Sequence, residues 1–99
     1  VPFPSAKWPS LNLGTPRTYA PETKTDNRSA YGQALADLAE ANDEKTVPFA
    51  VFDCDLAASV KTNGFAKVRP HQFFESGVQE HSTATTAGAV SADGILTFF

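Results

Sequence analysis

Two short segments of the 99-residue chain bring together side chains that could do chemistry. Residues 52–62 contain two aspartates, a serine and a lysine, and residues 74–81 contain two glutamates and a histidine. Each segment follows an apolar run that predicts a β-strand. Ligands of a parallel sheet gather outside the carboxyl ends of its strands. We therefore expect Asp55 and Glu80 to be neighbours along one rim of such a sheet.

Among these side chains, Glu80 is the strongest candidate for a chemical role. It falls in the first turn of a predicted helix, where the helix dipole favours a carboxylate by about 0.3–1 kcal/mol and helps to keep it ionised. An ionised carboxylate can form a strong charge-assisted hydrogen bond to a ring nitrogen. Taken alone, however, each candidate also has a structural explanation. Those explanations are a helix cap for Glu80, an Asx turn for Asp55, a structural imidazole for His81, a solvated helix start for Arg28 and a loop hydroxyl for Ser59.

Residues 1–25 differ in composition from the rest of the chain. They contain five of its seven prolines, and proline removes an amide donor and disfavours helix in the preceding residue. We predict an extended, proline-rich linker or strap here, followed by a separate unit over residues 26–99. The segment also carries large apolar side chains that favour a strap lying on a protein surface, namely Phe3, Trp8, Leu11, Leu13 and Tyr19.

A helix is predicted from about Asp26 to Ala41. Thr25 or Asp26 can cap it. Gly32 inside the helix costs about 1 kcal/mol relative to alanine, which suggests a close packing contact. The expected apolar stripe has helical spacing and consists of Tyr31, Ala34, Leu35 and Leu38.

Three apolar runs predict strands at residues 47–52, 73–74 and 95–99. The first is apolar almost throughout, as in a strand covered on both faces. Residues 80–92 predict a helix closed by Asp93-Gly94, with Ala84, Ala87 and Gly88 allowing close approach to a sheet or helix. The order is helix, strand, loop, strand, helix, strand. We predict an α/β fold with a parallel sheet flanked by helices.

Composition narrows the possible partners. The chain has 8 Lys and Arg residues and 11 Asp and Glu residues, and its basic residues form no stripe. Nucleic acid is therefore not expected as a partner. No apolar stretch approaches the roughly 20 residues that are needed to cross a bilayer, so a membrane is not expected as a partner. The single Cys54 cannot form an internal disulfide, which favours a location in the reducing cytoplasm. The cysteine and histidines show no zinc-ligand spacing, so no metal site is expected. Because the sequence stops within an apolar run, we expect a truncated domain.

The polar segments together resemble the transketolase family. The run Asp53-Cys54-Asp55-Leu56-Ala57-Ala58-Ser59 is similar to its Ala-Asp-Leu-x-x-Ser segment. The run from Phe73 to His81 resembles its Gly-Ile-x-Glu-His segment, and Asn27-Arg28-Ser29 resembles its Thr-Arg-x-x-Ser turn. The similarity covers roughly residues 22–99. It implies the first half of a pyrimidine-binding domain of a thiamine-diphosphate-dependent enzyme.

The resemblance also implies a role for each candidate residue. Glu80 matches the catalytic glutamate that hydrogen-bonds a pyrimidine nitrogen of the cofactor and favours its imino tautomer, and Asp55 matches an aspartate near the thiazolium ring and the substrate. Arg28 and Ser59 match positions that bind a sugar phosphate, and His81 belongs to the neighbourhood of the site. Two departures are Cys54, where alanine is usual, and Gln79, where arginine is frequent.

The implied parent enzyme transfers a two-carbon ketol unit between sugar phosphates. In the family, the aromatic residue that stacks on the pyrimidine would lie beyond Phe99, and the magnesium-binding domain comes from the partner subunit of a homodimer. We therefore expect the 99 residues to need the remaining domains of the parent enzyme and to be inactive alone. Alternatives are a deoxyxylulose-phosphate synthase, a 2-oxoacid dehydrogenase component, or a non-catalytic dimerisation module of the same fold.

Overall fold

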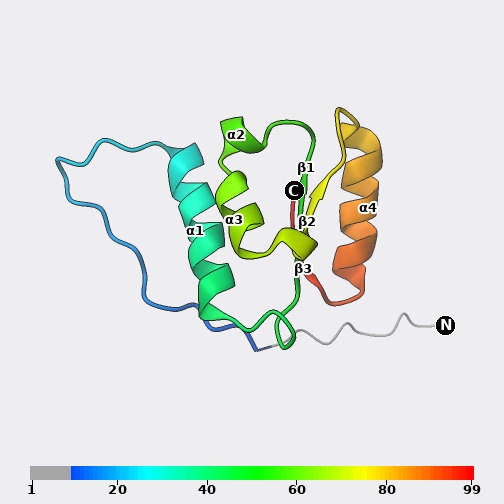
Figure 1. The fold of residues 1–99 in the computed structure, drawn as a ribbon, viewed down its shortest axis with the longest axis horizontal. Helices are drawn as coiled ribbons and strands as arrows, with labels where there is room; N and C mark the ends of the chain where they lie inside the picture. The colour runs from blue at the N-terminus through cyan, green and yellow to red at the C-terminus, as the bar shows by residue number, and fades with distance from the viewer. Residues whose placement is uncertain (1–9) are drawn as a thin grey trace.

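The computed structural model describes residues 10–99, and its sheet consists of three parallel strands with helices on both faces (Figure 1). The elements follow one another as α1 (Asn27–Ala41), β1 (Phe49–Asp53), α2 (Ala57–Val60), α3 (Asn63–Val68), a 3-10 turn (Pro70–Gln72), β2 (Phe73–Glu75), α4 (Glu80–Ala92) and β3 (Leu96–Phe98). The predicted α/β class and parallel sheet are confirmed.

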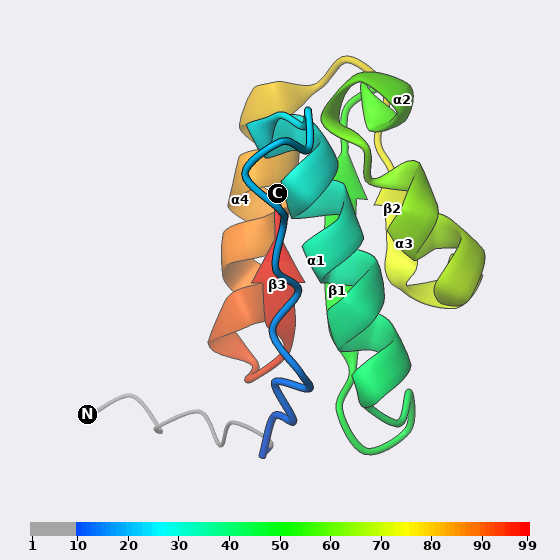
Figure 2. The same cartoon turned by 90° about the vertical axis from the view of Figure 1, so that its left-hand side faces the viewer.

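Strand β1 lies at the centre of the sheet, between β2 and β3. It pairs Asp53 with Glu75 of β2, and Phe49 with Leu96 of β3. Helices α1 and α3 cover one face, and α4 covers the other (Figure 1 and Figure 2). Because all strands run in the same direction, their carboxyl ends share one edge.

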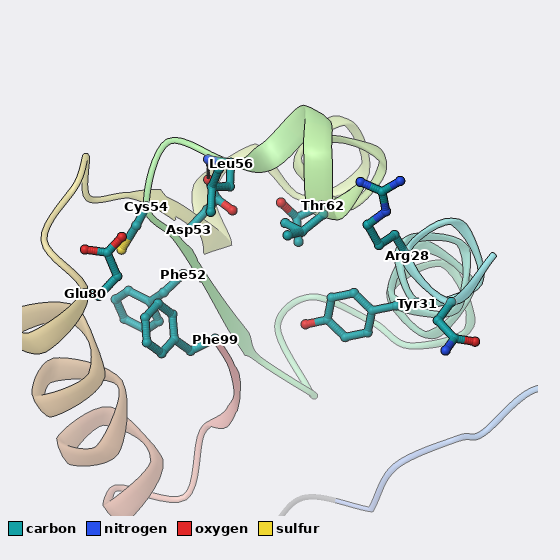
Figure 3. Close-up of a pocket in the computed structure, with 11 residues that line it drawn as sticks. Arg28, Tyr31, Phe52, Asp53, Cys54, Leu56, Thr62, Glu80 and Phe99 are labelled. Atoms are coloured by element: carbon teal, nitrogen blue, oxygen red, sulfur yellow. Dashed lines mark hydrogen bonds between the residues drawn. The ribbon is translucent and has the colours of Figure 1, made fainter.

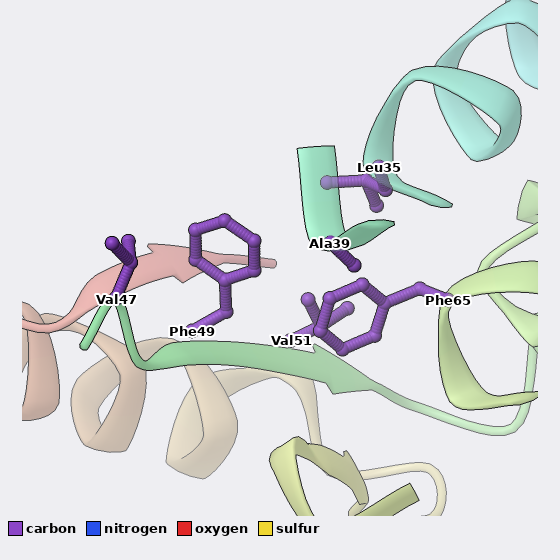
Figure 4. Packing of buried hydrophobic residues seen from close by; sticks show 6 residues of the cluster. All are labelled: Leu35, Ala39, Val47, Phe49, Val51 and Phe65. Carbon is purple, nitrogen blue, oxygen red and sulfur yellow. The ribbon is translucent and has the colours of Figure 1, made fainter. Parts of the chain in front are cut away.

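The core explains why β1 is apolar throughout. All five of its residues are buried. Phe49 and Val51 face α1 and α3, where they pack with Leu35, Ala39 and Phe65 (Figure 4). The alternate side chains, Ala50 and Phe52, face α4 and pack with Ala87. The prediction of a strand covered on both faces is therefore confirmed.

Helix α1 begins as predicted but buries a different stripe. The Asp26 carboxylate caps it by accepting a hydrogen bond from the Ser29 amide at 2.7 Å. The predicted stripe was wrong for Tyr31 and Ala34, which are exposed; the buried residues are Gly32, Leu35, Ala36 and Ala39. The cause is the close contact predicted at Gly32, which is confirmed: a Cβ there would overlap the Lys61 carbonyl. This approach turns the small residues of α1 inward.

The predicted loop between the first two strands was also wrong, because the structure contains α2, α3 and the 3-10 turn. Helix α3 has six residues, and Phe65 is its one fully buried side chain. Such a short helix shows no repeating apolar pattern. It is stabilised by packing onto α1 and the Phe49 ring, whose centre lies 6.1 Å from that of Phe65.

The remaining boundaries differ from prediction by one or two residues, apart from α4, which spans the predicted residues. Within α4, the prediction for Ala84 and Gly88 was wrong. Both are exposed, and a Cβ added at Gly88 meets nothing within 4 Å. Thr83 and Ala87, four residues apart, are the buried residues instead, because they lie on the helical face turned toward the sheet.

Residues 10–26 contain no helix or strand, and hydrogen bonds connect them to α1 and to Asn42, the residue after it. The Arg17 guanidinium donates to both carboxylate oxygens of Asp37, at 2.8 and 2.9 Å. Asn12 and Asn42 exchange two hydrogen bonds, at 2.9 and 2.8 Å. Leu11 packs against the core. The predicted strap residues Phe3 and Trp8 lie outside the described residues, and the boundary at residue 25 stays a prediction.

None of the helices described within residues 10–99 is both long and apolar enough to cross a membrane.

Candidate functional site

A pocket of about 410 Å³ opens at the carboxyl edge of the sheet (Figure 3). Its size falls within the range of small-molecule sites in proteins. The walls come from the start of α1, the end of β1, the α2 region, the start of α4 and the residue after β3. The lining residues are Asn27, Arg28, Tyr31, Phe52, Asp53, Cys54, Leu56, Val60, Thr62, Glu80 and Phe99.

Opposite charges border this pocket. Glu80 projects from the first turn of α4, and Arg28 projects from the first turn of α1 on the other side (Figure 3). Both residues are exposed. The Arg28 guanidinium donates to the Ser59 hydroxyl at 3.5 Å and lies 4.0 Å from the Asp26 carboxylate. The pocket can therefore receive a ligand that presents a hydrogen-bond donor at one end and an anion at the other.

Between these charges, the pocket is largely apolar. Phe52 and Phe99 form one side, and Tyr31 faces them from α1 with its hydroxyl directed inward (Figure 3). The partial burial of the Tyr31 side chain raises the pKa of its phenol above the usual value. The helical spacing of apolar residues predicted Tyr31 in the core stripe, so its position at the pocket was not expected from the sequence. Its position three residues after Arg28 was the available signal, since residues three apart share a helix face.

Two buried polar groups also lie at the pocket. Asp53 is 4% exposed, and its Oδ2 accepts a hydrogen bond from the Leu56 amide at 2.6 Å. Burial, followed by the neighbouring Glu75 carboxylate, raises the pKa of Asp53. Thr62 is 2% exposed, and its hydroxyl has no hydrogen-bond partner among the described residues. Asp53 was one of the two aspartates noted after the first strand but was given no role, and Thr62 was not predicted as a site residue.

The structure brings some of the predicted site residues together and separates others. Glu80 and Arg28 both line the pocket, and Ser59 joins them through Arg28. Asp55 is exposed and does not line the pocket; its backbone amide instead donates to Glu75 Oε1 at 2.7 Å. His81 is also exposed and outside the lining, and its carbonyl accepts a hydrogen bond from the Thr85 hydroxyl at 3.1 Å.

The chain is similar in sequence to known proteins. No family model matches the chain. Over 71 residues the chain is 34% identical to a protein assigned as a transketolase C-terminal section in Methanocaldococcus jannaschii, covering 72% of this chain and 21% of that protein. Over 68 residues it is 35% identical to a 1-deoxy-D-xylulose-5-phosphate synthase of Alkaliphilus oremlandii, covering 69% and 10%.

The predicted resemblance to the transketolase family is confirmed. The transketolase-like chain spans 21% of the length of the first relative and 10% of the second. It therefore corresponds to a limited part of each relative.

Proposed function

We propose that this chain is part of a thiamine-diphosphate-dependent enzyme that transfers a two-carbon ketol unit between sugar phosphates. The observation that carries the proposal is the position of Glu80. It begins α4 at the border of an aromatic-walled pocket, with Arg28 on the opposite side. In this proposal the 99 residues act within a larger, homodimeric parent protein, supply no magnesium ligand and are inactive alone. A cytoplasmic location stays a prediction.

The chemistry of the pocket fits the cofactor. The pyrimidine of thiamine diphosphate is a flat ring with polar nitrogens at its edge. Phe52, Phe99 and Tyr31 offer surfaces suited to such a ring, and Glu80 offers a carboxylate for a nitrogen. When bound, the cofactor supplies a nucleophilic carbon for attack on a carbonyl group.

The chain's own residues would bind, orient and hold protons. The Glu80 carboxylate would accept a hydrogen bond from the pyrimidine ring, and the apolar walls would exclude water and strengthen it. Arg28 and Ser59, already within 3.5 Å of each other, would bind the phosphate of a sugar phosphate. We further propose that Asp55 lies near the thiazolium ring and the substrate, and that His81 belongs to the surroundings of the site.

Replacement of Glu80 tests the assignment. In the full-length protein with saturating cofactor, Glu80→Gln should lower kcat for ketol transfer by about 100-fold or more, because the amide carries no negative charge for the ring nitrogen. Glu40→Gln, a matched change at an exposed position of α1, should leave kcat unchanged. Near-normal turnover of Glu80→Gln would contradict the proposal.

A second candidate keeps the cofactor and changes the substrate. The similarity to a 1-deoxy-D-xylulose-5-phosphate synthase favours it. A panel of ketose phosphates and 2-oxoacids, offered as donors to the full-length protein, separates the two. Activity with 2-oxoacids alone would favour the synthase or a 2-oxoacid dehydrogenase component. Cofactor binding without turnover of any donor would favour a non-catalytic dimerisation module.

A further inference from the structure

Glu75 connects the two loops at the carboxyl edge of the sheet. Its Oε1 accepts a hydrogen bond from the Asp55 amide at 2.7 Å and another from the Gly77 amide at 2.7 Å. One loop follows β1 and carries Asp55, and the other follows β2 and leads to Glu80 three residues after Gly77. A single carboxylate oxygen therefore holds both segments that carry the proposed acidic residues.

The two donors share an unusual backbone conformation. Asp55 has φ 61° and Gly77 has φ 71°, and both values lie in the left-handed region. Glycine adopts this region readily, whereas an aspartate does so at some cost. A hydrogen bond from the Asp55 amide offsets part of that cost. Glu75 thus stabilises both turns, and the turn at Asp55 depends on it more because aspartate adopts this conformation at a cost.

The sheet places Glu75 correctly for this contact. Asp53 and Glu75 are register partners at the ends of β1 and β2. Just beyond them, the Ser76 amide donates to the Asp53 carbonyl at 2.8 Å. The two strands therefore remain paired as far as the loops, and the Glu75 side chain bridges the loops where the pairing ends.

The pKa values of the two acids at this edge shift in opposite directions. The Gly77 amide, together with the Asp55 amide, lowers the pKa of Glu75, whereas burial raises the pKa of Asp53. Glu75, whose Oε1 accepts from two amides, is therefore the acid whose ionised form these contacts favour. Hydrogen bonds to an ionised acceptor are roughly twice as strong as those between neutral groups.

We propose that Glu75 is a positioning residue, which fixes Asp55 and Glu80 relative to each other and so prepares the carboxyl edge for the cofactor. The proposal rests on the proposed function in one respect, namely the roles given to Asp55 and Glu80. Glu75 does not line the pocket, so it acts through the two loops.

The test uses the full-length protein with Glu75→Ala, Glu75→Gln and the control Glu40→Ala. Glu75→Ala removes the acceptor and should raise the cofactor KM and lower kcat, together by about 10- to 100-fold in kcat/KM. Glu75→Gln keeps an acceptor oxygen and should recover most of this loss. If Glu75 only stabilised the fold, the folded molecules would keep their kcat and cofactor KM, and that result would overturn the proposal.

Amide hydrogen exchange without cofactor gives a readout independent of activity. Residues 54–56 and 76–79 should exchange faster in Glu75→Ala than in Glu75→Gln, and unchanged exchange at either loop would refute the bridge. If Glu75→Ala does not fold, Glu75→Asp keeps the charge but moves the oxygen back by one methylene, and the same measurements apply. Normal activity of Glu80→Gln would instead reject the proposed function. The exchange result would still show whether Glu75 holds the two loops together.

Discussion

The guanidinium carbon of Arg69 lies 4.5 Å from the centre of the Phe49 ring, in a side chain that is 2% exposed. Its amino groups donate to the carbonyls of Val47 and Asn42 at 2.7 Å each, and to that of Ala39 at 3.3 Å. They also donate to Gln72 Oε1 at 2.8 Å, which in turn accepts from the Phe49 amide. One buried cation therefore connects the end of α1, the start of β1 and the turn before β2.

Replacing Arg69 with methionine should strongly destabilise the fold. The change keeps a long apolar side chain but leaves buried carbonyl oxygens without a donor. We expect the free energy of unfolding to fall by about 2–4 kcal/mol in denaturant titrations. Lys67→Met, which removes an exposed cation from α3, should change it by no more than about 0.5 kcal/mol. Equal effects of the two variants would show that Arg69 has no special structural role.

Two of the helical glycines, Gly32 and Gly88, should respond oppositely to alanine. At Gly32 the new Cβ would overlap the Lys61 carbonyl and push α1 away from the α2–α3 connection, which should cost about 1–3 kcal/mol of stability. At Gly88 the Cβ meets nothing within 4 Å, so the better helix propensity of alanine should add up to about 1 kcal/mol. Thermal unfolding followed by circular dichroism measures both. A stabilised Gly32→Ala variant would disprove the close contact.

The ion pair between Arg17 and Asp37 predicts a pH dependence. The Arg17 hydrogen bond, together with one from Gln33, lowers the pKa of Asp37 from 3.8 to about 2. Because this folded-state pKa lies below the ordinary value, ionised Asp37 favours the folded chain above pH 3.8. That contribution is lost as the pH falls through about 2.

Arg17→Ala should therefore move the Asp37 pKa back toward its ordinary value. NMR titration of the Asp37 side-chain carboxyl measures the change directly. Lys24→Ala, another cation of the same extended segment, should leave the Asp37 midpoint where it is. An unchanged midpoint in Arg17→Ala would mean that the pair does not persist in solution.

Sequence alone determined the features that depend on consecutive residues. The continuous apolar run at residues 47–52 predicted a strand covered on both faces, and the small residues before Asp93-Gly94 predicted α4 with Glu80 in its first turn. Local spacing was sufficient because a strand or helix imposes its period on its own neighbours. The order of polar segments was likewise enough for the family resemblance.

Tertiary structure decided which faces meet. Because α1 packs closely at Gly32, Tyr31 lies at the pocket and not in the core, where it was expected. Helix α3 buries one residue, Phe65, and was not predicted. The link between Asp55 and Glu75 joins residues 20 apart through one oxygen. Such contacts depend on the relative placement of elements distant in sequence, and no period within either segment encodes that placement.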